Sequence, residues 1–203
     1  MKKWFPRLLI IIGIAVLLLA VGLKIYDLAN DYSAGRNSQL LLEQMQQNTA
    51  LSKTEEPVTD PSEEPSETQA QPELSYNVIG ILEIPSLKLE LPVLSECTPS
   101  LLKVSVCRYM GGAEDGAERL VVAGHNYKSH FGTISQLEIG AEVRFTGLSG
   151  VEYSYEVTEI TVIAANDLKT LESGEWDIAL FTCNFGGTKR ILVRCQEITR
   201  DEA

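Results

Sequence analysis

An uncharged, strongly apolar stretch near the N-terminus constrains the structure of this chain most. Residues 8–23 read LLIIIGIAVLLLAVGL and contain no charged side chain. If Lys24 extends its ammonium group to the membrane interface, Ile25 and Tyr26 lengthen the apolar stretch to 19 residues. This length is enough for one helix to cross the hydrocarbon core of a bilayer. We therefore expect residues 1–26 to form a cytoplasmic tip and a transmembrane anchor.

Basic residues before this stretch predict its orientation. Lys2, Lys3 and Arg7 precede it, and Trp4 lies where interfacial aromatic side chains are common. By the positive-inside rule the N-terminus is cytoplasmic, and the rest of the chain lies outside the cell membrane. A cleaved signal peptide is the alternative, because residues 20–22 are small. The length of the apolar stretch and the lack of a polar segment at its end favour an uncleaved anchor.

Two segments of different composition follow the anchor. Residues 27–50 contain three consecutive leucines among helix-forming residues, which predicts a stalk helix with a break near Gly35. Residues 51–75 consist mainly of Pro, Glu, Ser and Thr, and they hold too few apolar side chains to offset the entropy lost on ordering. We expect this second segment to be a disordered, acidic tether.

From Tyr76 onward the apolar pattern changes to alternation with a period of two. Residues 87–91, LKLEL, alternate strictly, as a half-buried strand does. Helical pattern is confined to residues 100–103 and 166–172. The expected strands, rich in Val, Ile, Tyr and Phe, are 78–84, 87–91, 119–123, 141–146, 152–164, 177–182 and 190–198. So many short strands predict a mainly β domain over residues 76–203, folded as a closed or nearly closed barrel with short helices.

The charge balance excludes one class of partner. The chain has 17 Lys and Arg residues against 28 Asp and Glu residues, a formal net charge of −11, and both residues 1–75 and residues 76–203 are acidic. Nucleic-acid binding requires a basic stripe or patch, because phosphate contacts supply most of its affinity. We therefore expect no nucleic-acid partner.

Four cysteines and two histidines supply the candidates for catalysis. His125 follows the apolar segment 120–124, and Cys183 ends the apolar segment 178–183. A thiol becomes a strong nucleophile where an imidazolium or guanidinium stabilises its thiolate, so one Cys, one His and one Arg suffice for acyl transfer. Arg190 opens the next strand, and a hairpin of that length returns it to the thiol. Strand alternation also allows Arg194, which lies on the same face.

Several of these segments together resemble the sortase family. The segment LFTC at 180–183, followed by KRILVR at 189–194, is similar to the Thr-Cys and Arg signature of sortases. Residues 80–85 with 91–93, and residues 123–126 with 131–132, are similar to its opening strands and its histidine segment, GILEIP with LPV and AGHN with FG.

This resemblance implies a closed sortase-type β-barrel of about eight strands, with one transmembrane helix before it. By the resemblance, Cys183 is the nucleophile, His125 is the acid and base, and Arg190 positions the substrate and stabilises the oxyanion. The chemistry needs no metal or organic cofactor.

The resemblance further implies a cysteine transpeptidase on the cell surface. It would cleave an LPxTG-like C-terminal sorting motif of surface proteins through a thioester, and transfer the acyl group to an amine of a cell-wall peptide or a pilin. Asp60 and Pro61 are followed by Ser62, whereas the lid of pilin-building sortases has an aromatic residue there, and no second hydrophobic segment follows Cys195. Both features favour cell-wall anchoring. The alternatives are a pilin-polymerising sortase, a surface cysteine protease and a catalytically idle barrel that binds peptides.

The remaining histidine and cysteines lie outside this pattern. His130 is expected at the surface or as a loop-stabilising residue, and Arg194 as a solvated or ion-paired strand residue. The motif does not explain Cys97, Cys107 and Cys195. A Cys97–Cys107 disulfide is compatible with an extracytoplasmic domain, but the pairing does not follow from the sequence. A zinc site would need paired ligand spacing such as CxxC, which this chain lacks.

Overall fold

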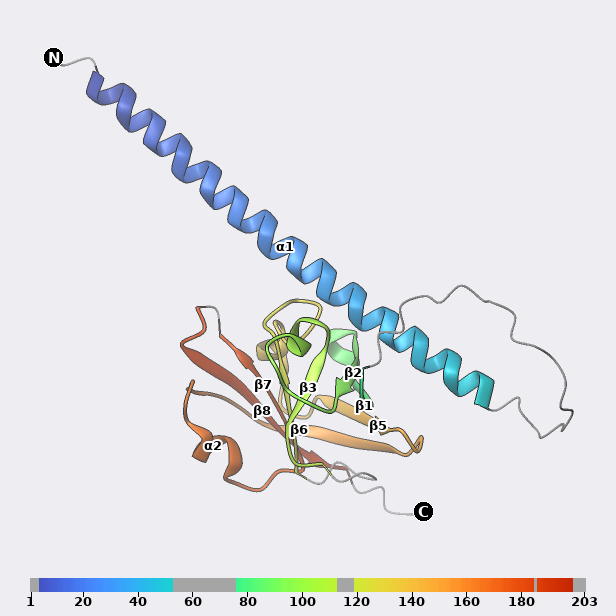
Figure 1. Cartoon of the computed structure of the whole chain (residues 1–203). Coiled ribbons are helices and arrows are strands. Elements are labelled where there is room, and N and C mark those ends of the chain that lie inside the picture. Colours follow the sequence, from blue (N-terminus) through green and yellow to red (C-terminus); the bar gives the residue numbers. More distant parts are fainter. Residues whose placement is uncertain (1–3, 53–75, 113–118, 185, 199–203) are drawn as a thin grey trace, which may run out of the picture.

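The computed structural model of the chain describes residues 4–52, 76–112, 119–184 and 186–198. Its described part is one long N-terminal helix beside a β-barrel (Figure 1). The helical elements are α1 (Trp4–Ser52), η1 (Pro85–Leu87), η2 (Leu101–Lys103), η3 (Ile134–Gln136) and α2 (Leu168–Glu172). The strands are β1 (Val78–Ile84), β2 (Leu89–Leu94), β3 (Val106–Met110), β4 (Leu120–Gly124), β5 (Glu142–Gly147), β6 (Glu152–Ala164), β7 (Ile178–Cys183) and β8 (Lys189–Glu197). The predicted tether lies almost wholly outside the described residues.

The eight strands of the described residues close into a barrel in the order β1-β2-β3-β4-β7-β8-β6-β5. Two neighbouring pairs are parallel, β2 with β3 and β4 with β7, and the other pairs are antiparallel. The closed barrel confirms the predicted fold class. Parallel neighbours have their carboxyl ends at the same edge of the sheet, so β4 and β7 deliver the residues after them to one place.

Alternate side chains of the strands fill the barrel with one apolar core. Its fully buried members include Leu82, Ile84, Leu120, Phe131, Tyr155, Ile178 and Leu180. Phe131 belongs to the connection after β4 and packs directly against the last residue of that strand. A Cβ atom on Gly124 would lie 2.5 Å from Cδ2 of Phe131, so only glycine permits this packing. The core therefore holds both ends of the segment that contains His125.

Two strand predictions are corrected by the structure. The strand expected at 87–91 begins only at Leu89 and continues to Leu94, because Pro85 starts the turn η1 and Lys88 adopts a left-handed conformation with φ of 55°. Strand β3 was not expected at all. Its first two residues are buried and its last three are exposed or half-buried, so it shows no alternation that marks a strand in the sequence.

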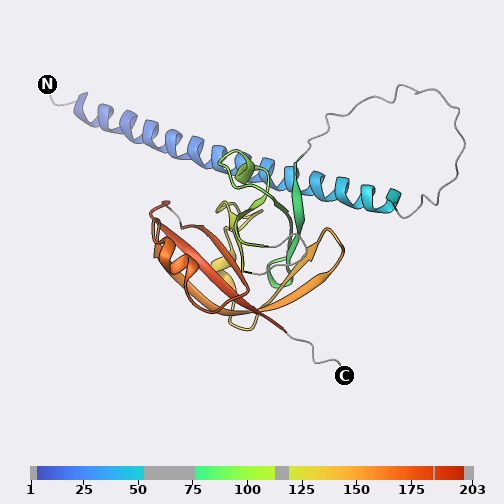
Figure 2. The same ribbon diagram turned by 60° about the horizontal axis from the view of Figure 1, so that its bottom comes forward.

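Helix α1 runs without interruption from its apolar N-terminal part to Ser52 (Figures 1 and 2). Among the described residues it is the one helix that is long and apolar enough to cross a membrane, with the candidate span inside Leu8–Gln47. The break expected near Gly35 is absent. A Cβ atom at this position would lie 2.9 Å from Cβ of Ser129, so the glycine permits a close contact between helix and barrel.

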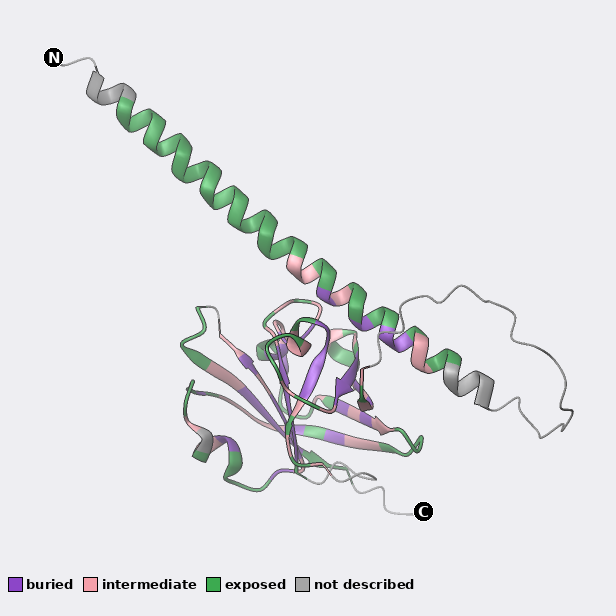
Figure 3. Ribbon diagram, viewed as in Figure 1, coloured by how far each residue is buried: buried purple, intermediate pink, exposed green. Residues whose placement is uncertain are grey.

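The C-terminal half of α1 packs on the barrel along one face. Figure 3 shows buried positions there and exposed positions along the apolar half. The buried side chains recur every three to four residues, as one helix face requires, and they are Ala34, Ser38, Leu41 and Leu42. The Asp31 carboxylate accepts hydrogen bonds from the backbone N–H of Ser129 at 3.0 Å and from its hydroxyl at 2.7 Å. The helix is thus attached to the connection between β4 and η3.

Candidate active site

The carboxyl ends of β4 and β7 bring His125 and Cys183 to the same rim of the barrel. These strands are parallel neighbours, with Gly124 opposite Thr182 in the ladder. His125 is the next residue after Gly124, and Cys183 is the next after Thr182. The Thr182 side chain points inward and is 1% exposed, whereas the Cys183 side chain is partly exposed on the outer face. The thiol is therefore accessible to a substrate on the outside of the barrel.

The β7–β8 hairpin returns Arg190 directly to the thiol. Cys183 and Arg190 are opposite each other in the antiparallel ladder, so both side chains leave the same face of the sheet. Asn184 closes the turn, because its backbone N–H donates to the Lys189 carbonyl at 3.0 Å and its side-chain oxygen accepts from the Lys189 N–H at 2.8 Å. Gly187 has a φ of 73°, which suits the tight return.

The His125 imidazole is half-buried and stacks on the ring of Tyr127, with 4.6 Å between ring centroids and 27° between ring planes. Burial lowers the pKa of His125, and the positive charge of Lys103 lowers it further. A neutral imidazole can accept a proton at neutral pH. Among the described residues, no hydrogen bond joins this ring to the Cys183 thiol. Tyr127 was not predicted as a site residue. The one indication in the sequence is an aromatic residue two positions after the histidine.

The Arg190 guanidinium is held at the rim by backbone carbonyl groups of its own hairpin. Its Nη1 donates to the carbonyl oxygens of Gly187 and Lys189, both at 3.1 Å. Both bonds use one nitrogen, so the other N–H groups of the guanidinium remain available to a substrate oxygen. A cation with several free donors on the residue opposite Cys183 suits a developing oxyanion.

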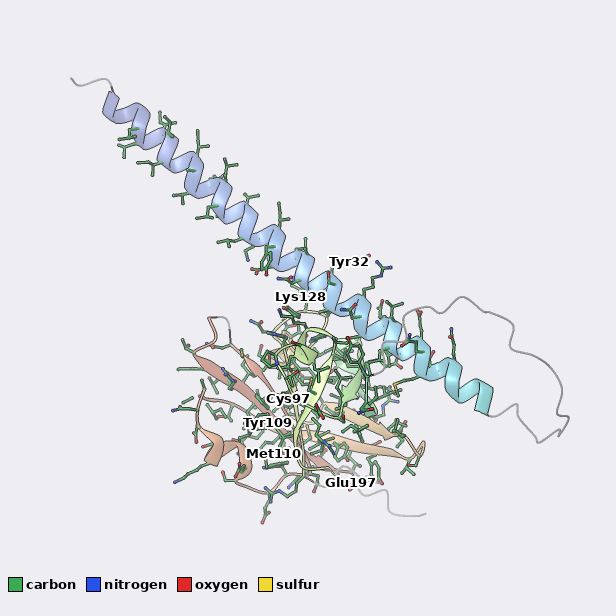
Figure 4. All side chains as sticks on the ribbon, in the orientation of Figure 1. Tyr32, Cys97, Tyr109, Met110, Lys128 and Glu197 are labelled. Carbon is green, nitrogen blue, oxygen red and sulfur yellow. The ribbon has the colours of Figure 1, made fainter. Side chains whose placement is uncertain are left out.

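An aromatic pair lies on the same outer face, next to the thiol along β7. The rings of Tyr109 and Phe181 meet edge to face with centroids 5.1 Å apart. Tyr109, labelled in Figure 4, is 40% exposed, and Phe181 precedes Cys183 by two residues on β7. The sequence does not reveal this pair, because Tyr109 lies on β3, a strand that no alternation marks. The rings offer an apolar surface to a peptide that approaches the thiol.

Arg194 lies on the same strand as Arg190 but makes different contacts. It is only 8% exposed, and its guanidinium donates to the Glu159 carboxylate and to the carbonyl of Thr170. Thr170 belongs to α2, whose N-terminus is capped by the Asp167 carboxylate at 3.1 Å. Of the two expected environments, solvated or ion-paired, the structure shows the ion pair with Glu159, and the side chain is buried rather than solvated. Arg194 is covered by the β6–β7 connection and fixes that connection to the sheet.

His130 is fully buried beneath α1, so the expectation of a surface position is wrong. Its Nε2 lies 3.1 Å from Oγ of Ser38, and this hydroxyl donates its proton to the Val104 carbonyl at 2.7 Å. Nε2 therefore carries the proton of the neutral ring, and Nδ1 has no hydrogen-bond partner among the described residues. Burial, together with the nearby His125, lowers the pKa of His130 to about 4.

The other cysteines belong to packed clusters. Cys195 is fully buried in the barrel core, and burial raises the pKa of its thiol to about 12. Cys97 and Cys107 are neighbours in a separate cluster that Leu41 of α1 completes. All four cysteines, including Cys183, are free thiols. Within the described ranges, no group of three His, Cys, Asp or Glu side chains is arranged to hold a metal ion.

A family model with the description Sortase domain matches residues 82–198, which include His125, Cys183 and Arg190. The chain belongs to the sortase family. Members of this family are cysteine transpeptidases. Sortase A of Bacillus anthracis is 31% identical to this sortase over 110 residues, which are 52% of this chain and 52% of that protein. The match therefore spans about half the length of that relative.

Solved sortase structures share the barrel. Sortase A of Corynebacterium diphtheriae, a lid mutant, superposes with a TM-score of 0.56 at 24% identity and covers 64% of this chain and 75% of its own. Sortase C of Clostridium perfringens, solved with the C-terminal cell wall sorting motif, has a TM-score of 0.53 at 26% identity and covers 61% and 72%. The first likeness shows the fold alone.

Proposed function

We propose that this sortase is a membrane-anchored cysteine transpeptidase that cleaves an LPxTG-like sorting motif and transfers the acyl group to an amine. The observation that carries the proposal is the pairing of Cys183 with Arg190 across the ladder, beside His125 at the end of the neighbouring parallel strand. A nucleophile, a titratable base and a fixed cation on one accessible rim are the parts that acyl transfer needs.

In the first half-reaction, His125 accepts the proton of the Cys183 thiol, and the thiolate attacks the carbonyl carbon of the sorting motif. The carbonyl oxygen becomes an oxyanion, which Arg190 stabilises through its free N–H donors. His125 then donates the proton to the leaving amine, the peptide bond breaks, and a thioester remains on Cys183.

In the second half-reaction, a primary amine attacks the thioester. His125 takes a proton from this amine and returns it to the departing Cys183 thiolate, so that the enzyme is restored and a new amide is formed. Water in place of the amine gives hydrolysis. The acceptor is an amine of a cell-wall peptide. Asp60 and Pro61 are followed directly by Ser62, whereas the lid of a pilin-building sortase has an aromatic residue at that place.

Helix α1 determines where the barrel lies relative to the membrane. Its first part crosses the membrane with Lys2, Lys3 and Arg7 on the cytoplasmic side, and the barrel lies outside. The contact between Asp31 and Ser129 begins five residues after Tyr26. At a rise of about 1.5 Å per residue, this contact lies within roughly 10 Å of the end of the apolar stretch. The barrel is thus held close to the membrane surface.

The test is turnover of fluorogenic LPxTG-like peptides by the full-length protein in detergent. Each peptide is incubated with and without a cell-wall peptide that carries a free primary amine, and the products are identified by mass spectrometry. A ligated product that forms only with the amine, and that is lost in Cys183→Ala but kept in Cys195→Ala, supports the proposal.

Other outcomes contradict it in distinguishable ways. Cleavage at one rate with and without the amine, and no ligated product, would indicate a surface cysteine protease. Ligation to a pilin lysine but not to the cell-wall peptide would indicate a pilin-polymerising sortase. Peptide binding without any turnover would indicate an idle barrel.

A further inference from the structure

We infer that Cys97 and Cys107 are a reversible disulfide site, which is oxidised by thiol–disulfide exchange with a small-molecule or protein disulfide, and that Cys97 reacts first. The site is separate from Cys183 and does not depend on the proposed function. It lies in the cluster that joins α1 to the barrel, which also contains Leu41 and Leu94.

Strand pairing brings the two thiols together. β2 and β3 are parallel, with Leu94 opposite Cys107. Beyond Leu94 the chain stays beside β3, because the Ser95 carbonyl accepts a hydrogen bond from Nε of Arg108 at 3.1 Å. Cys97 follows two residues later and packs against the buried cluster that contains Cys107. Neighbouring thiols on segments held this firmly can be linked without a large backbone movement.

The two thiols differ in their access to solvent. Cys97, labelled in Figure 4, is half-buried in the loop after β2, whereas Cys107 is fully buried. The neighbouring Cys107 thiol lowers the pKa of Cys97, and the neighbouring Cys97 thiol together with burial raises the pKa of Cys107. The accessible thiol is therefore also the one that forms a thiolate more readily, as an attacking cysteine requires.

The exchange is balanced in two steps. The Cys97 thiolate attacks one sulfur of the oxidant disulfide, which forms a mixed disulfide and releases one thiolate of the oxidant. Cys107 gives its proton to that thiolate and attacks the Cys97 sulfur, which closes the bond between Cys97 and Cys107 and releases the second oxidant group as a thiolate, which takes a proton from water. The two cysteines lose two electrons, and the oxidant disulfide gains them.

The bond would stabilise the cluster that joins α1 to the barrel. It closes a short loop that contains Leu101 and Val104, and both residues belong to this cluster or pack on it. Cross-linking a loop of this size reduces the entropy of the unfolded chain, so the oxidised domain should melt roughly 5–10 °C higher than the reduced domain.

The test uses the full-length Cys183→Ala protein in detergent, so that the active-site thiol does not react. Reduced protein is equilibrated with glutathione buffers of increasing disulfide fraction, the remaining thiols are alkylated, and tryptic peptides are mapped without reduction. Cleavage at Lys88, Lys103 and Arg108 places the two cysteines on different peptides, so the disulfide appears as a cross-linked pair. We expect this pair and no adduct on Cys195.

Two single variants test the order of reaction. With Cys107→Ser, Cys97 should retain glutathione as a stable mixed disulfide. With Cys97→Ser, which alters a half-buried loop position and should leave the fold intact, Cys107 should remain an unmodified thiol. Thiols that stay free in the most oxidising buffer would overturn the inference. Glutathione on Cys107 of a folded Cys97→Ser protein, shown by its melting curve, would overturn the assigned order.

Discussion

His125 and His130 lie five residues apart on the connection after β4, yet their environments differ completely. His125 is at the rim, half-exposed, and its ring is stacked on Tyr127. His130 is fully buried beneath α1, where its Nε2 meets the Ser38 hydroxyl. One end of this connection therefore offers a titratable group to a substrate, and the other end attaches the barrel to its helix. The same residue type is suited to chemistry at one position and to structure at the other.

The largest expected effect separates these two histidines. His125→Asn should lower peptide turnover by about 10²–10⁴, the usual contribution of a general acid and base, with little change in melting temperature. His130→Asn should lower the melting temperature by several degrees and leave turnover per folded molecule within about threefold, because it loses buried packing and the hydrogen bond to Ser38. Initial rates beside thermal melts of both variants measure this. Equal losses of turnover at equal stability would contradict the division of roles.

The second effect compares the two arginines of β8. Arg190→Lys should lower the turnover rate by on the order of 10²–10³, close to the loss in Arg190→Ala, because an ammonium lacks the planar fork of donors that an oxyanion needs. Arg194→Lys should keep the rate of the folded enzyme and lower its stability by about 1–2 kcal/mol, because it loses one of its two partners, Glu159 or Thr170. Rates and denaturant melts are the measurements. A crippled Arg194→Lys enzyme with normal stability would show that the wrong arginine has been assigned.

These comparisons also show what the sequence can and cannot predict. Alternation and turn length predict that His125, Cys183 and Arg190 lie at strand ends. The register of β4, β7 and β8 agrees with these three positions. The burial of His130 depends on Ser38, a residue 92 positions away, and no local pattern reports such a contact.

The remaining wrong predictions concern residues that a distant segment of the chain covers. Arg194 looks like an exposed strand residue until α2 folds over it. Gly35 reads as a helix breaker because the pattern does not reveal that Ser129 needs its space. Tertiary contacts of this kind override local preferences, and they form between segments that are distant in the sequence.

The third effect is loss of stability in acid. The pKa of His130 is about 4 in the folded protein and near 6.5 in the unfolded chain, so the unfolded state binds more protons between these values. This contribution to stability is complete above pH 6.5 and is lost as the pH falls towards 4, by about 3 kcal/mol in total. Urea melts from pH 7.5 to 4.5 should show the loss, and His130→Asn should show a weaker dependence than His125→Asn. Parallel pH profiles of the two variants would contradict this account.

The smallest effect concerns the attachment of α1. Asp31→Asn should weaken the contact with Ser129 by about 1 kcal/mol, because an amide oxygen accepts the two hydrogen bonds less strongly than a carboxylate. Hydrogen exchange should then accelerate at the backbone N–H of Ser129, with turnover nearly unchanged. Glu142→Gln, at an exposed ion pair with Arg144, is the matched control and should leave that exchange rate unaltered.

The central claim is that Cys183 is the nucleophile of the rim site, and trapping of the acyl-enzyme tests it most directly. The full-length protein is incubated with a sorting peptide without an amine, quenched in acid, and digested for mass spectrometry. We predict one thioester adduct, on the peptide that contains Cys183, which disappears on addition of hydroxylamine and is absent from Cys183→Ala. An adduct on Cys97, Cys107 or Cys195, or an adduct that persists in Cys183→Ala, would contradict the claim.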